Sequence, residues 1–171
     1  MVKLSGILLA FIASAAVGFL KASEVKRRKS LLLDFKELIL HISTEMSYFK
    51  EPLPQIFERL SGENEKTSSI LLRECLLRYN LENLNIAFIW KQAVERIYAK
   101  EPVNREDVAV MKKCGDFLGQ SDFKGQQDHF RLLGLQLDRQ IEDAEEGIRT
   151  KGRMYGKMGI SVGLVIAIVL I

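Results

Sequence analysis

The sequence is poor in cysteine and proline, and this scarcity excludes several classes of protein. Two cysteines among 171 residues are too few for a small secreted fold that depends on disulfides. Three prolines and twelve glycines are too few for a collagen-like or low-complexity chain. With 47% hydrophobic residues, the composition is also too apolar for an intrinsically disordered chain. What remains is one ordinary domain, or a smaller domain with appended segments.

The motifs of several enzyme classes are missing as well. No G-x-x-x-x-G-K-[ST] loop is present to bind phosphates, and no serine has an adjacent base or elbow motif. Glu37, His41 and Glu45 follow i, i+4 spacing on one helix face, which would suit a metal. Neither His41 nor His129 lies in a Glu-x-x-His motif of the kind that di-iron bundles use. We therefore expect a polar helix face here, and no enzyme activity, metal or cofactor.

Two further clusters have simple structural interpretations. Cys75 and Cys114 lie far apart in the sequence, each on or beside an apolar stripe, which favours buried thiols over a disulfide or zinc site. An acidic run could bind a cation, but on a helix it is more often a solvated face. This acidic run consists of Glu142, Asp143, Glu145 and Glu146.

Apolar residues concentrate at the two ends of the chain. Residues 4–20 carry no charge, residues 158–171 carry none either, and extending the second run back to 154 adds only Lys157. As a helix, the first run would be about 25 Å long, near the lower limit for crossing a bilayer. We expect one membrane-spanning helix at each end. The alternative for the first run is a cleavable signal peptide, because Lys3 precedes it and Ala13-Ser14-Ala15 resembles a cleavage site.

The charges are also divided along the chain. The net charge of +3 combines +1 from Lys3, +4 in residues 21–29 and +4 in residues 149–157 with −6 in residues 30–148. Basic residues mark the cytoplasmic side of a membrane span, so residues 21–157 are expected in the cytoplasm, with the first helix retained. The KRRK run at 26–29 also fits a nucleic-acid patch, but the adjacent apolar run and the acidic middle disfavour that interpretation.

The middle of the chain has the periodicity of a helical bundle. Apolar residues recur at spacings of three and four at Leu32, Phe35, Ile39, Ile42, Met46 and Phe49. Pro52 and Pro54 are expected to end this helix, and further helices are expected near 55–60, 69–79 and 84–99, the second of these with Thr67 or Ser68 as its cap. Asn104 with Asp107 predicts a capping box before a fifth helix that ends at Gly119, and a last helix begins after 122 and can continue unbroken to 171.

No run of alternating β-branched residues predicts a strand. The expected fold is all-α: a cytoplasmic bundle of about six helices (22–152) flanked by terminal transmembrane helices (1–21 and 153–171). Two G-x-x-x-G spacings near the second span favour close packing of helices in lipid, although glycine is common in membrane helices generally. These spacings are formed by Gly152, Gly156, Gly159 and Gly163.

Three groups of residues carry a family resemblance. They are Glu45-x-x-Tyr48 with Pro52-Leu53-Pro54; Trp90; and Gly115-x-x-Leu118-Gly119-x-x-Asp122 with Gln126-Gln127. Together with the terminal apolar runs, they resemble the stage III sporulation protein AB family of endospore-forming Firmicutes over essentially the whole chain. Cys114 departs from the aromatic residue expected before Gly115.

The resemblance implies a function that no residue chemistry reveals. The family's soluble part is similar to the cytoplasmic helical domain of the F-type platform protein of type II secretion systems. Its members belong to a channel complex between mother cell and forespore during engulfment, in the outer forespore membrane with the bulk of the chain cytoplasmic. The expected partners are the membrane, the secretion-type ATPase stage III sporulation protein AA, other stage III channel proteins and further copies of the chain. Neither nucleic acid nor a small-molecule substrate is expected, and a generic membrane-tethered adaptor is the alternative function.

The residues of the resemblance divide by expected role. Leu53, Trp90 and Leu118 are expected to pack the core, and the glycines at 115 and 119 to allow close packing or end a helix. A third set either caps and bridges helices at a corner of the bundle or forms a partner surface. This third set consists of Tyr48, Asp122, Gln126 and Gln127.

Overall fold

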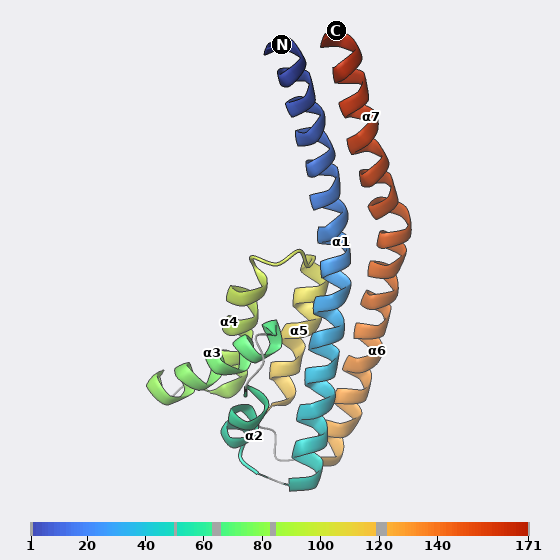
Figure 1. The fold of residues 1–171 in the computed structure, drawn as a ribbon. Coiled ribbons are helices and arrows are strands. Elements are labelled where there is room, and N and C mark those ends of the chain that lie inside the picture. The colour runs from blue at the N-terminus through green and yellow to red at the C-terminus, as the bar shows by residue number, and fades with distance from the viewer. Residues whose placement is uncertain (1, 50, 63–65, 83–84, 119–122, 171) are drawn as a thin grey trace. The chain divides into compact units, whose positions relative to one another are not determined.

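The computed structural model describes every residue except 1, 50, 63–65, 83–84, 119–122 and 171. All regular structure in the described part of the chain is helical, which confirms the all-α prediction (Figure 1). The helices are α1 (Val2–Phe49), α2 (Leu53–Leu60), α3 (Thr67–Glu82), α4 (Ile86–Tyr98), α5 (Arg105–Phe117), α6 (Phe123–Gly147), the π-helix η1 (Ile148–Gly152) and α7 (Arg153–Leu170).

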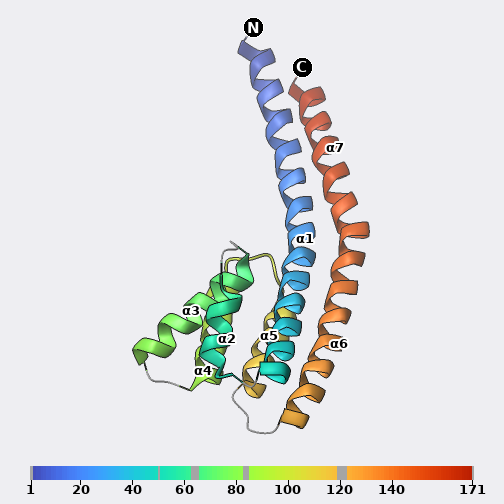
Figure 2. The same cartoon turned by 60° about the horizontal axis from the view of Figure 1, so that its bottom comes forward.

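The chain divides into two compact units. The first, here called the helix-pair unit, comprises Met1–Lys29 and Glu142–Ile171. In it the first half of α1 runs antiparallel to the end of α6, η1 and α7, since Ser14 bonds Gly159 whereas Arg28 bonds Asp143. Both views show these two stretches side by side (Figures 1 and 2). The second, here called the bundle unit, comprises Ser30–Ile141.

Six helices contribute to the bundle unit over its described residues: the second half of α1, then α2, α3, α4 and α5, and most of α6. The apolar stripe predicted on α1 is buried from Leu32 to Met46. Aromatic rings form the centre of the core, where the Trp90 ring lies 6.0 Å from the Phe35 ring and 5.9 Å from the Phe57 ring. The unit therefore has a hydrophobic core of its own.

Local sequence signals explain where α2, α4 and α5 begin. α2 begins at Leu53, directly after Pro52 and earlier than the predicted 55. Pro54 is tolerated in its first turn because the amides of that turn have no partner within the helix. Asn85 caps α4 by accepting a hydrogen bond from the Ala87 amide at 2.8 Å. The predicted capping box of α5 has both of its bonds, from the Asn104 amide to Asp107 at 2.8 Å and from the Asp107 amide to Asn104 at 2.7 Å. Gly119, predicted to end α5, lies outside the described residues.

Two predictions of regular helices need correction. Thr67 or Ser68 was expected to cap α3, but the capping side chain is Asp34 of α1. Its carboxylate accepts hydrogen bonds from the Ser68 amide at 3.0 Å and from the Ser68 hydroxyl at 2.7 Å. The last helix does not run to 171 as a uniform α-helix, because residues 148–152 form a π-helical turn. Gly147 precedes this turn and Gly152 is its last residue, and glycine holds the α-helical geometry weakly.

Among the residues that the structure describes, no helix is both long enough and apolar enough to span a membrane. The two predicted spans fall at the start of α1 and in α7, and several of their side chains lie outside the described part of the chain. The two transmembrane helices are therefore unsupported by the structure and stay a prediction from the sequence.

Candidate partner surfaces

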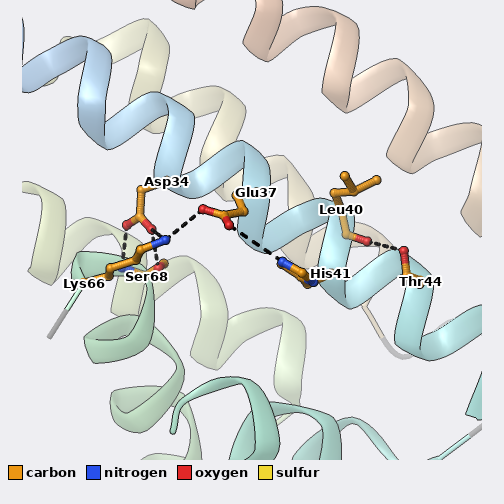
Figure 3. A network of polar contacts seen from close by, with 7 residues as sticks. All are labelled: Asp34, Glu37, Leu40, His41, Thr44, Lys66 and Ser68. Atoms are coloured by element: carbon orange, nitrogen blue, oxygen red, sulfur yellow. Dashed lines mark hydrogen bonds and ion pairs between the residues drawn. The ribbon is translucent and has the colours of Figure 1, made fainter. Parts of the chain in front are cut away.

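The polar face around His41 is a network of ion pairs (Figure 3). Lys66 lies between two carboxylates of α1, 2.8 Å from Glu37 and 3.9 Å from Asp34. Its hydrogen bond to Glu37 holds the pKa of that carboxyl below its ordinary value, and His41 Nε2 approaches the same carboxylate at 3.9 Å. Glu45 pairs instead with Arg59. The carboxylates of the Glu37/His41/Glu45 series thus face basic side chains, and no metal-binding group of three is found among the described residues.

The two thiols are free and fully buried. Burial raises the pKa of Cys75 to about 12, and burial raises the pKa of Cys114 well above its ordinary value. Since the thiolate is the reactive form, this burial disfavours reactivity at both side chains. The structure therefore places both as packing residues.

Three residues of the family resemblance lie together in the core. The Trp90 indole donates a hydrogen bond to the Met111 carbonyl at 2.9 Å, which joins α4 to α5. A Cβ atom on Gly115 would lie 2.9 Å from Trp90 Cδ1 and 3.0 Å from the Ala87 carbonyl. The glycine therefore lets the two helices approach closely, and Leu118 is buried at the end of α5.

Another group lies where α1 ends and α2 begins. Arg59 of α2 pairs with Glu45 and, at 2.8 Å, with Glu51. Pro52 precedes α2, and Leu53, half-buried, is its first residue. Tyr48 differs from these neighbours, because 80% of its surface is exposed.

Gln127 connects α6 to α1. Its side-chain amide donates a hydrogen bond to the Ser47 hydroxyl at 3.0 Å, so it bridges helices. Asp122 and Gly119 lie outside the described residues, as does the side chain of Gln126.

Gln127 also borders a groove of about 370 Å³ between α1 and α6, whose apolar part includes Leu40 and Phe130. The sequence did not single out this groove, because its wall combines stripes from two helices that are distant in the chain.

Exposed apolar residues also follow one face of α3. They recur at helical spacing at Ile70, Leu77 and Leu81, on the opposite side from the buried Leu71, Leu72 and Cys75. Contiguous exposed apolar residues of this kind often mark protein interfaces.

Glycines make a close backbone contact in the helix-pair unit. A Cβ atom on Gly18 would lie 2.8 Å from the Tyr155 carbonyl, and one on Gly159 would lie 3.0 Å from Gly18 Cα. The Ser14 hydroxyl donates to the Gly159 carbonyl at 2.9 Å. By contrast, a Cβ on Gly156 would meet no atom within 4 Å.

Of the four glycines singled out in the sequence, Gly159 lies against α1, at Gly18 and Ser14. Gly152 is half-buried, and a Cβ atom added to it would lie 4.0 Å from its nearest neighbour, the Gly147 carbonyl oxygen. Gly163 is buried. Sequence reasoning missed Gly18. Its signal was the small-x-x-x-small spacing from Ser14 to Gly18, which is the same pattern as G-x-x-x-G.

Ion pairs connect the basic and acidic segments of the helix-pair unit. Arg28 lies 2.8 Å from Asp143, and Lys29 lies 3.3 Å from Glu145. The hydrogen bond from Lys29 and a further one from Arg149 hold the pKa of Glu145 below its ordinary value. The acidic run is exposed, as expected for a solvated face, but two of its four carboxylates also pair across the unit.

The assignment of the acidic run to the helix-pair unit changes the net charge of the bundle. The four acids of 142–146 belong to the helix-pair unit, so the bundle unit retains 15 basic and 17 acidic residues in the sequence. A bundle close to neutral offers little long-range attraction to a charged partner. Its partner surfaces are better sought in exposed side chains than in net charge.

Comparison with known proteins agrees with this architecture. Residues 3–171 match the family described as stage III sporulation protein AB. The chain belongs to this family. A relative with the same name from Bacillus subtilis (strain 168) is 21% identical over 99% of each chain. A solved structure of stage III sporulation protein AB covers 72% of this chain and 97% of its own, with a TM-score of 0.66 and 19% identity. At that identity the structure supports a shared fold, and the family membership makes the chain a sporulation protein.

Proposed function

We propose that the chain is a non-enzymatic, membrane-anchored platform component of a secretion-like sporulation channel, coupling a cytoplasmic ATPase to the membrane complex. The observation that carries this proposal is the match to the stage III sporulation protein AB family over residues 3–171. The same fold would suit a generic membrane-tethered adaptor, and the family match is what favours the channel.

The surface of the helix-pair unit supports membrane anchoring. Large apolar side chains are exposed along both of its helical stretches, at Leu9, Ile12, Val17, Phe19, Leu20, Met158, Ile160, Val162, Leu164, Val165 and Ile168. An exposed apolar surface of this extent is unfavourable in water and favourable in lipid. The basic clusters at 21–29 and 149–157 adjoin this surface, as they would on the cytoplasmic side of a bilayer.

Tyr48 supports a partner site on the bundle unit. It belongs to the family resemblance, yet its side chain is almost fully exposed and contributes little to packing. Aromatic side chains with a polar end are common at the centres of interfaces. We therefore place the ATPase contact at the α1–α2 corner, around Tyr48.

Binding of the full chain to the ATPase tests this site. We expect Tyr48→Ala to weaken co-purification with stage III sporulation protein AA about tenfold or more, because interface tyrosines often contribute over 1 kcal/mol. Tyr79→Ala is the matched control, since Tyr79 is an exposed tyrosine on α3. Equal binding by the two variants would exclude the corner as the contact, and failure of the unaltered chain to bind would exclude the coupling role.

Topology needs a separate probe. The buried native thiols would resist labelling on either side of a membrane, so they cannot report the location of the bundle. An Asn80→Cys variant places a thiol on an exposed part of α3. We expect an impermeant maleimide to label it after cell lysis and not in intact cells. Labelling in intact cells would place the bundle outside and contradict the proposal.

A further inference from the structure

A groove beside the glycine crossing of the helix-pair unit has the form of a ligand site. Its volume is about 540 Å³, within the roughly 300–1,000 Å³ range of small-molecule sites. Residues from α1 and α7 line it, among them Val17, Gly18, Lys21, Tyr155, Met158 and Val162. The site lies entirely within one unit, and neither the family resemblance nor the proposed coupling role assigns it a purpose.

The length of the groove is apolar. Val17 and Met158 are more than half exposed and Val162 is 47% exposed, so they form open walls rather than a closed core. The floor is the contact of Gly18 with Gly159, where backbone meets backbone and no side chain fills the space. An extended apolar chain can lie along such a surface without displacing protein atoms.

One end of the groove is polar and basic. Because α1 and α7 are antiparallel, Lys21 and Tyr155 lie at the same end, next to the clusters at 21–29 and 149–157. The Lys21 ammonium is 2.8 Å from Glu24, but both side chains are about half exposed. Such an exposed pair contributes little, so an anion can compete for this ammonium. The Tyr155 phenol adds a hydrogen-bond donor of the kind found at the headgroup level of membranes.

We propose that this groove binds an anionic phospholipid, with one acyl chain along Val17, Met158 and Val162 and the phosphate at Lys21 and Tyr155. The proposal rests on the proposed membrane anchoring and deepens it. An apolar groove that ends in a cation matches an amphiphile that has an apolar chain and an anionic head. A third helix or a second copy of the chain would use the apolar walls and leave the basic end without a counterpart.

Two measurements on the full chain separate the anchoring from the site. Flotation with vesicles of phosphatidylcholine alone, at alkaline pH, tests anchoring without any anionic lipid. Native mass spectrometry of the chain released from mixed bilayers then counts phosphatidylglycerol and phosphatidylcholine molecules retained. We expect phosphatidylglycerol to be preferred, and Lys21→Gln to lower its retention about fivefold, the effect of one basic residue near an anionic surface. Lys26→Gln is the matched control, because Lys26 is exposed on the same helix and does not line the groove.

A second pair of variants tests the apolar part. Val17→Phe should fill the groove and lower retention, whereas Ala16→Phe adds the same ring beside it and should not. Equal retention by Lys21→Gln and Lys26→Gln, or no preference for phosphatidylglycerol, would overturn the site while flotation still supports anchoring. A dimer that Val17→Phe dissociates would assign the groove to a second copy and also overturn it. Failure to float with phosphatidylcholine would overturn the anchoring, and the site with it.

Discussion

The bundle unit and the helix-pair unit are both helical, yet they bring helices together by opposite means. In the bundle, large side chains fill the space between helices, and Trp90, Phe35, Phe57 and Tyr98 have almost no exposed surface. In the helix pair, Gly18 meets Gly159, and no side chain lies between the two backbones there. Large apolar side chains such as Leu9 and Ile168 are exposed there instead.

This difference supports the proposal that the helix pair, and not the bundle, lies in lipid. Burial of apolar side chains stabilises a fold in water, and the bundle obtains that stabilisation from its own core. The helix pair gains little from burial, so backbone contact and ion pairs hold its helices together. Contact of this kind is typical of helices packed in lipid, where leaving the apolar side chains exposed carries no penalty.

Removal of the largest core side chain should have the largest effect, and only on the bundle. Trp90→Ala deletes a fully buried ring and its hydrogen bond to Met111. We expect a loss of about 3–5 kcal/mol in the free energy of unfolding, seen as a drop of roughly 10 °C or more in Tm by circular dichroism.

Leu81→Ala is the control for this experiment. Leu81 is also apolar, but 81% of its surface is exposed, so its removal should change stability by about 0.5 kcal/mol or less. If the two variants melted at the same temperature, the core assigned to the bundle would be wrong.

The sequence predicted the bundle well because its signals are local. Spacings of three and four placed the buried stripe of α1, prolines separated α1 from α2, and Asn104 with Asp107 marked the start of α5. Each of these depends on residues within one or two turns. The core roles of Trp90 and Leu118 follow from the same periodicity.

Features that join distant segments could not be predicted in this way. The Asp34 cap of α3 and the Gln127 bridge to Ser47 each need two helices in their final positions. The same holds for Gly18, whose partner is 141 residues further along the chain. Gly159 could not be chosen over Gly156 for this contact from local spacing, since both occur in G-x-x-x-G spacings.

A single methyl group should therefore separate the helix pair without affecting the bundle. The methyl of Gly18→Ala would lie 2.8 Å from the Tyr155 carbonyl, and backbone must move to admit it. We expect a cost of about 1–3 kcal/mol in helix pairing, with the Tm of the bundle unchanged. Spin labels at Ser23 and Thr150, both exposed, would report the change as a longer interhelical distance.

Gly156→Ala adds the same methyl group where no atom lies within 4 Å. It should leave the distance between the labels unchanged. A distance that responds equally to both substitutions would show that loss of glycine flexibility, rather than contact with Tyr155, separates the helices.

The smallest effect is expected from pH, and again in the helix pair. Lys29 and Arg149 hold the pKa of Glu145 below 4.5 in the folded chain, so the carboxylate binds its proton more weakly there than when unfolded. A lowered pKa contributes stability at pH values above 4.5, and this contribution is lost as the pH falls through the folded value. The distance between the spin labels should thus begin to lengthen below about pH 4.5, and added salt should weaken the pairing at neutral pH because the pair is partly exposed.

Glu145→Gln should reduce both responses, whereas Glu146→Gln, a change at the next residue of the same exposed run, should retain them. If both variants kept the full response, the ion pairs of Glu145 with Lys29 and Arg149 would not contribute to holding the helices together.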